Sequence, residues 1–273
     1  MQRNGRDPTR RNRNQGTRRR GHGQDNRFAL PSPRVERFHL ERVDDATVHR
    51  RMLHDGVPLI VLETQLRAGF SHPCSVDDVE HVLRALPKDD LPTSNDGEVC
   101  VVLWQQGEKE TVVSQWWGSL WYCLELENDD VSFFGPAIYL GAAKPPLEVT
   151  WSSKADVVGQ ERRVLMEDVA DDVHRTKRET TYTFSLEAAR RMQMEFTLLH
   201  EVGHWMDYRT HVLDAQERAY DEVGESDAEL AEASAEWDRL AHAYWQRSTE
   251  QKERWADRYA AKALRELRRR GVL

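Results

Sequence analysis

The sequence has few of the features that mark secreted or membrane-embedded proteins. Its three cysteines, Cys74, Cys100 and Cys123, form no Cys-x-x-Cys pair. An odd and sparse set argues against a disulfide-linked scaffold and favours a reducing compartment. The chain has no run of 18 apolar residues and no apolar N-terminal stretch of the signal-peptide type. We therefore expect a cytoplasmic protein without a membrane span.

Charge is distributed unevenly along the chain. Residues 1–27 contain nine arginines against Asp7 and Asp25, a net charge of +7, which leaves −15 for residues 28–273. With almost no apolar content, residues 1–27 cannot offset the entropy cost of ordering, so we predict a disordered arm. Such an arm can bind nucleic acid or a membrane surface, or rest on the acidic remainder of the chain. No aromatic residue lies among its arginines to stack on bases.

Residues 28–273 are enough for one domain, with a β-rich half over 28–184 and a helical half over 185–273. In the first half, Ser75 is the expected N-cap of a helix over 76–86. We assign Trp116, Trp117 and Trp121 to packing of the sheet rather than to a binding platform. Residues 154–178 are expected to be helical or irregular. Runs of β-branched and aromatic residues predict strands at 35–40, 57–62, 99–104, 111–126, 131–134, 137–140 and 179–184.

In the second half the apolar spacing becomes helical. Ser185 is the expected N-cap of a helix that runs to about Tyr208, followed by a loop over 209–226. Two long helices are predicted over 227–246 and 249–270, with Ser248 and Gln251 forming a capping box. The predicted fold is α+β, a mixed twisted sheet packed on the first of these helices, with a helical C-terminal half.

The run His200-Glu201-Val202-Gly203-His204 carries the main chemical signal. Residues four apart lie on one face of an α-helix, so both imidazoles can bind a single metal ion. Glu201 then lies beside the metal, where it can deprotonate a metal-bound water. Gly203 in a helix costs about 1 kcal/mol relative to Ala, which suggests a close approach by a strand or by substrate. The alternative is a pair of hydrogen-bonded histidines in a core helix.

A catalytic zinc site needs a third protein ligand besides the two histidines. Glu253 and Asp257 are four residues apart, so one carboxylate can bind the metal while the other accepts a hydrogen bond from a ligand histidine. Ala256 and Ala260 would let their helix pack closely against another. His211 is one position too late for the third histidine of the metzincin pattern. The alternative for Glu253 is an ordinary surface ion pair.

These two stretches together resemble the gluzincin clan of zinc metallopeptidases. His200-Glu201-x-Gly203-His204, followed by Glu253-x-x-Ala256-Asp257-x-Tyr259-Ala260, is similar to the motifs of HtpX-like and of repressor-cleaving ImmA/IrrE-type peptidases. The resemblance implies a zincin-like fold, with Zn²⁺ held by His200, His204 and Glu253. It also implies Glu201 as general base and Asp257 as the partner of a ligand histidine. The chain lacks the membrane helices of the HtpX-like pattern. Asp257 stands where ImmA/IrrE-type peptidases commonly have Asn, and the gap between the motifs is longer, so the subfamily stays open.

The expected function is that of a zinc metalloendopeptidase acting on a protein or peptide substrate. A non-catalytic zincin-fold binding or regulatory module, tethered to nucleic acid by residues 1–27, is the alternative. Tyr208, His211 and Tyr220 are the candidates for stabilising the oxyanion. Residues 180–184 or 137–140 are the expected strand edge for an extended substrate.

Overall fold

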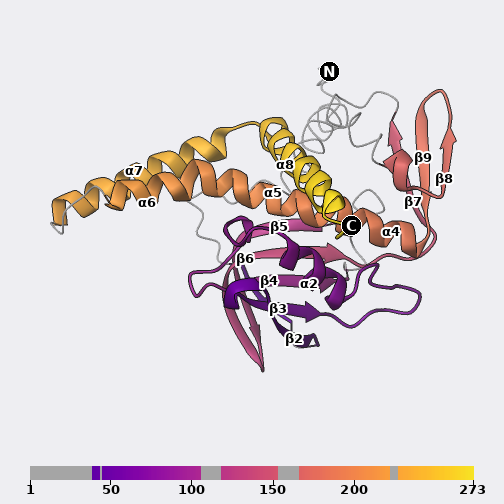
Figure 1. Ribbon diagram of the computed structural model, residues 1–273, viewed down its shortest axis with the longest axis horizontal. Helices are drawn as coiled ribbons and strands as arrows, with labels where there is room; N and C mark the ends of the chain where they lie inside the picture. The colour runs from indigo at the N-terminus through magenta and orange to yellow at the C-terminus, as the bar shows by residue number, and fades with distance from the viewer. Residues whose placement is uncertain (1–38, 44, 106–117, 153–165, 222–226) are drawn as a thin grey trace, which may run out of the picture.

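The computed structural model describes residues 39–43, 45–105, 118–152, 166–221 and 227–273. The predicted arm over 1–27 lies outside them, as do the start of the strand expected at 35–40, Trp116 and Trp117. Two β-sheets are followed by a helical C-terminal half, which confirms the predicted α+β class (Figure 1). Within the described ranges, no helix is both long and apolar enough to cross a bilayer.

The larger sheet is mixed and has six strands in the order β1-β5-β6-β4-β3-β2. The β1/β5, β4/β6 and β3/β4 pairs are parallel, and the β5/β6 and β2/β3 pairs are antiparallel. Strand β2 was not anticipated from the sequence. The strands are β1 (His39–Arg42), β2 (Thr47–Met52), β3 (Pro58–Glu63), β4 (Val99–Trp104), β5 (Gly118–Asn128) and β6 (Val131–Gly141).

Strand β6 corrects the prediction of two short strands separated by Gly135 and Pro136. The register of the β5/β6 pair shifts between Trp121 and Leu124, so Pro136 lies opposite a β-bulge. Proline has no N–H to donate to the ladder, and a bulge removes the need for one. The strand therefore continues through a residue pair that normally ends strands.

Both faces of this sheet are buried, which explains the continuous apolar runs of β3 and β4. Val99, Val101 and Leu103 face the core that contains the helices, whereas Cys100 and Val102 belong to a second core on the opposite face. The bulge in β5 also changes which face its side chains occupy. Leu120 and Tyr122 point toward the helices, while Leu124 and Leu126 join the second core. Trp121 packs at 6.2 Å from the ring of Tyr139, as expected for sheet packing.

A smaller antiparallel sheet has the order β7-β9-β8, with β7 (Leu147–Ser152), β8 (Asp172–Arg175) and β9 (Glu179–Phe184). The strand at β9 was predicted, but β7 was missed. Strand β8 falls within a stretch that was expected to be helical or irregular. Cross-strand pairing with β9 overrides the high charge of that stretch, because β-structure depends on neighbouring strands more than on local composition.

Helix α2 (Val76–Ala85) has Ser75 as its N-cap, as predicted, and the cap forms a capping box that was not predicted. Two short 3-10 helices are η1 (His54–Gly56), before β3, and η2 (Lys88–Asp90), after α2. The helical half begins with α4 (Leu186–Met192), capped by Ser185, then the π-helix η4 (Gln193–Thr197) and α5 (Leu198–Tyr208). Helices α7 (Asp227–Gln246) and α8 (Thr249–Arg269) match their predicted ranges.

The loop predicted over 209–226 is wrong for its first part. A π-helix η5 (Arg209–Leu213) and α6 (Asp214–Asp221) continue directly from α5. Val212 is fully buried with Ala241 and Tyr244 of α7, so packing against α7 keeps this segment helical. Helices α6 and α7 run side by side away from the sheets, whereas α8 crosses α5 (Figure 1).

Helices α5 and α8 pack with their backbones in contact. A Cβ atom at Gly203 would lie 2.8 Å from the carbonyl oxygen of Ala256 and 2.9 Å from its Cα atom. The glycine is therefore required by a neighbouring helix, rather than by the strand or substrate expected from the sequence. Ala256 and Ala260, predicted to allow close packing, are both buried.

We expect Gly203→Ala to destabilise the protein by about 1–3 kcal/mol, because the added methyl group meets backbone atoms that cannot rotate away. Urea unfolding followed by circular dichroism measures the change. Ala261→Leu on the exposed face of α8 is the control, since its added volume lies in solvent. Equal unfolding midpoints for the wild type and Gly203→Ala would contradict the contact.

A second prediction concerns the ion pair between α2 and α4. The Arg190 guanidinium, hydrogen-bonded to Asp78 at 2.5 Å and 3.0 Å, lowers the pKa of that carboxyl to about 2, against the opposing effect of burial. The stabilisation is thus complete above the unfolded-state pKa of about 3.9 and is lost as the pH falls toward 2. The difference in unfolding free energy between wild type and Asp78→Asn should be constant near pH 7 and shrink between pH 4 and 2. Asp77→Asn, at a highly exposed neighbour, should show little of this dependence.

Candidate metal centre

Helix α5 brings His200, Glu201 and His204 to one region above the larger sheet. The ring centroids of His200 and His204 are 4.6 Å apart and their planes are nearly perpendicular, at 89°. His204 and Glu201 are buried, with 8% and 4% of their surfaces exposed. The helical spacing read from the sequence thus places both imidazoles on the same side.

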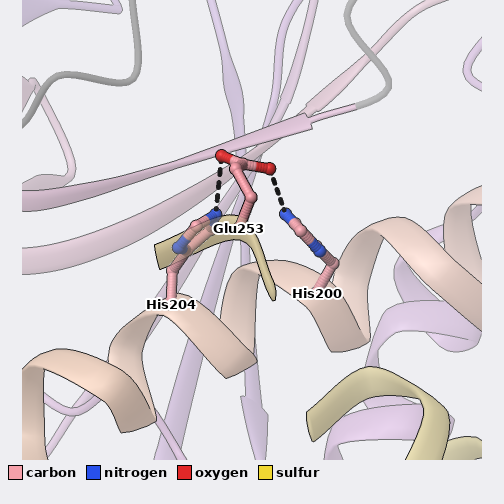
Figure 2. Close-up of side chains that lie close together, drawn as sticks. All are labelled: His200, His204 and Glu253. Atoms are coloured by element: carbon pink, nitrogen blue, oxygen red, sulfur yellow. Dashed lines mark ion pairs between the residues drawn. The ribbon is translucent and has the colours of Figure 1, made fainter. Parts of the chain in front are cut away.

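Helix α8 supplies the carboxylate of Glu253, which lies between the two imidazoles (Figure 2). Its Oε2 atom is 3.4 Å from Nε2 of His200, and its Oε1 atom is 3.4 Å from Nε2 of His204. These separations exceed the range of about 2.7–3.2 Å for an N–H···O hydrogen bond. Two donors on a tetrahedral zinc ion, each at 2.0–2.2 Å, are about 3.4 Å apart.

One ligand atom from each of these three residues lies within 4.8 Å of the other two. His200, His204 and Glu253 therefore form a possible metal-binding cluster, and their nitrogen and oxygen donors suit Zn²⁺.

Asp257, one turn beyond Glu253 on α8, fixes the orientation of His200. The Nδ1 atom of His200 lies 2.8 Å from Oδ1 of Asp257. Because a carboxylate accepts only, the imidazole donates from Nδ1 and keeps the lone pair of Nε2 for a metal. The sequence predicted this contact for a ligand histidine, and the structure assigns it to His200.

A buried polar cluster holds the C-terminal end of α5. The Tyr122 hydroxyl donates to the carbonyl oxygen of His204 at 3.1 Å, and burial raises its pKa well above the usual value, so it stays protonated. Asp207 is fully buried and accepts hydrogen bonds from Arg247 at 2.8 Å and from Tyr244 at 3.3 Å. Arg247 lies in the turn between α7 and α8, so this ion pair fastens the start of α8 to α5. Sequence reasoning missed the cluster.

A small pocket lies at His204 and Glu253 of the possible metal-binding cluster, between α5, β5 and the first turn of α8. Burial lowers the pKa of the Lys252 ammonium, an effect that Arg247 reinforces and that Asp207 and Glu253 oppose. Lys252 was not singled out from the sequence, although it directly precedes Glu253. The lining residues are Leu120, Tyr122, Glu201, His204, Thr249, Lys252 and Glu253.

Two of the oxyanion candidates named from the sequence, Tyr208 and His211, are not among the described residues that line this pocket. Tyr208 packs against Tyr122 with ring centroids 4.9 Å apart, and Nδ1 of His211 lies 2.8 Å from the backbone carbonyl oxygen of Asp207. The side chain of Tyr220 lies outside the described residues. Tyr122, which the sequence reading did not consider, is the tyrosine on the pocket wall.

Both predicted substrate edges are wrong. Residues 137–140 belong to β6, which pairs with β5 on one side and β4 on the other. Residues 180–184 belong to β9, which lies between β7 and β8. Neither has a free edge. In the described part of the chain, β1 pairs with residues 124–127 of β5, whereas residues 118–121 of β5 pair with β6.

Comparisons with protein-family models, with curated proteins and with solved structures give no match.

We expect Glu253→Ala to lose most bound zinc, because only two of three protein ligands remain. Asp257→Ala should weaken zinc binding by about 10- to 100-fold, since His200 loses its orienting partner. Zinc content of the purified protein and competition with a chelator measure both effects. Glu266→Ala, an exposed carboxylate on the same helix paired with Arg269, is the control. Full zinc content in Glu253→Ala would place the third ligand elsewhere.

Proposed function

We propose that the protein is a zinc-dependent metallopeptidase with a zincin-like site. One observation carries the proposal: ligand atoms of two imidazoles and a carboxylate converge within 4.8 Å of one another, with buried Glu201 lining the adjoining pocket. Three protein ligands leave a position for water or substrate, as in catalytic rather than structural zinc sites. The gluzincin-like motif spacing supports the same reading.

A bound zinc ion would lower the pKa of its water to about 7 and polarise a substrate carbonyl. Glu201 is the residue placed to accept the proton of that water and to return it to the leaving amine. Its burial, with 4% exposed, keeps bulk water from competing for the proton. Asp257 holds His200 in the tautomer that a metal requires, and Glu253 neutralises part of the metal charge.

The edge of β5 that no described strand covers supports an extended peptide as substrate. Among the described strands, β1 pairs with β5 from residue 124 onward, residues 118–121 of β5 pair with β6, and Leu120 and Tyr122 line the pocket. An extended peptide that adds to this edge would form main-chain hydrogen bonds and pass beside Glu201 and His204. Pairing of this kind is tolerant of sequence, so pockets beside the strand decide specificity.

Glu201→Gln tests the general-base assignment. The amide keeps the size of the side chain but cannot accept the proton, so peptide hydrolysis should fall by at least about 100-fold while zinc content is unchanged. Hydrolysis of a denatured protein substrate, followed by mass spectrometry, measures the loss in zinc-loaded protein. Exposed Glu217→Gln on α6 is the control. Activity that survives Glu201→Gln would exclude the proposed mechanism.

A further inference from the structure

Lys252 is a buried cation that has no carboxylate partner among the described residues. Only 8% of its surface is exposed, and within the described residues no carboxylate oxygen lies within 4 Å of its Nζ atom. Burial of a charged group is costly unless it is paired. The contacts of the ammonium are with aromatic rings, 5.4 Å from the centroid of Tyr244 and 5.3 Å from that of Trp245.

The position of Lys252 is electrostatically unfavourable for a cation. It lies in the first turn of α8, where the helix dipole favours negative charge. Arg247, immediately before α8, has its guanidinium carbon 5.3 Å from the centre of the same Tyr244 ring. The cation–π contacts offset only part of this cost. An apolar side chain would fill this position without the cost of burying a charge. The buried ammonium group therefore suggests that its charge has a function.

The other charged residues of the pocket indicate what that function is. Lys252 shares the pocket with the carboxylates of Glu201 and Glu253. Among the side chains that line the pocket, a divalent metal ion would balance the charges of Glu201 and Glu253, and the Lys252 ammonium adds one further positive charge. A bound group with a single negative charge would complete the balance, and the dipole of α8 would favour it as well.

We propose that Lys252 binds a carboxylate of the peptide substrate, next to the bond that is cleaved. The inference rests on the proposed function and specifies its substrate class: peptides with an acidic side chain, or a free C-terminus, beside the scissile bond. A phosphate group fits less well, because it carries nearly two negative charges next to two glutamates.

Malonyl hydroxamates test the proposal, because the hydroxamate group binds zinc whatever the cleavage sequence is. Three probes are compared on the zinc-loaded full chain by titration calorimetry: malonyl-hydroxamate-linked alanine with a free carboxylate, alaninamide, and glutamic acid α-amide. At least one acidic probe should bind about tenfold or more tightly than the alaninamide probe, since hydrogen bonds to charged groups are strong. Tighter binding of the probe with the free alanine carboxylate would indicate that Lys252 recognises the C-terminus of the substrate. Tighter binding of the glutamic acid probe would indicate that it recognises an acidic side chain.

Three variants complete the experiment. Lys252→Met should abolish the preference for the acidic probe without weakening the alaninamide probe, and Lys252→Arg should retain it. Lys262→Met, on the exposed face of α8, should behave as wild type. Equal binding of all three probes to the wild type, or an unchanged preference in Lys252→Met, would overturn the inference alone. Failure of every hydroxamate to bind zinc-loaded protein would contradict the proposed function as well.

Discussion

The contact between Gly203 of α5 and Ala256 of α8 is the constraint on which the site depends. With no side chain at position 203, the backbones of the two helices touch. The glutamate side chain is short, so the carboxylate of Glu253 reaches the imidazoles of α5 only when α8 lies in contact with α5. Asp257, one turn farther along α8, then meets Nδ1 of His200 at 2.8 Å. A wider helix spacing would remove the third donor and the orienting hydrogen bond together.

Burying this many charged groups is costly, and the structure offsets the cost in two ways. Asp207 is fully buried, but its carboxylate accepts hydrogen bonds from Arg247 and Tyr244, and this cluster links the end of α5 to the turn before α8. Glu253 and Glu201 sit at the pocket instead, where the proposed metal ion would compensate them. The Asp207 carboxylate is thus paired within the protein, whereas the carboxylates at the pocket are placed to pair with a bound ion.

The errors in the predicted fold have a shared physical origin. Gly135 and Pro136 were read as a strand break, but the bulge of the neighbouring strand accommodates them. Residues 209–221 were read as loop, but Val212 is buried against α7. The two predicted substrate edges proved to be central strands. In each case the deciding partner is distant in sequence, so local composition could not reveal it.

Local chemistry in the sequence was sufficient for the helix starts at Ser75, Ser185 and Ser248, because a cap and its helix lie within a few residues. It was also sufficient to place His200 and His204 on one face, since the helical repeat alone sets that geometry. The convergence of Glu253, about fifty residues later, was predicted from motif resemblance, but only tertiary packing could determine its distance to the imidazoles. The positions of Tyr122 and Lys252 on the pocket wall, and the edge of β5 that no described strand covers, came from the tertiary structure alone. These features form where the bulged strand β5 contacts the helices α5 and α8. The three elements are far apart in the sequence, so the spacing of residues within any one of them does not predict the contact.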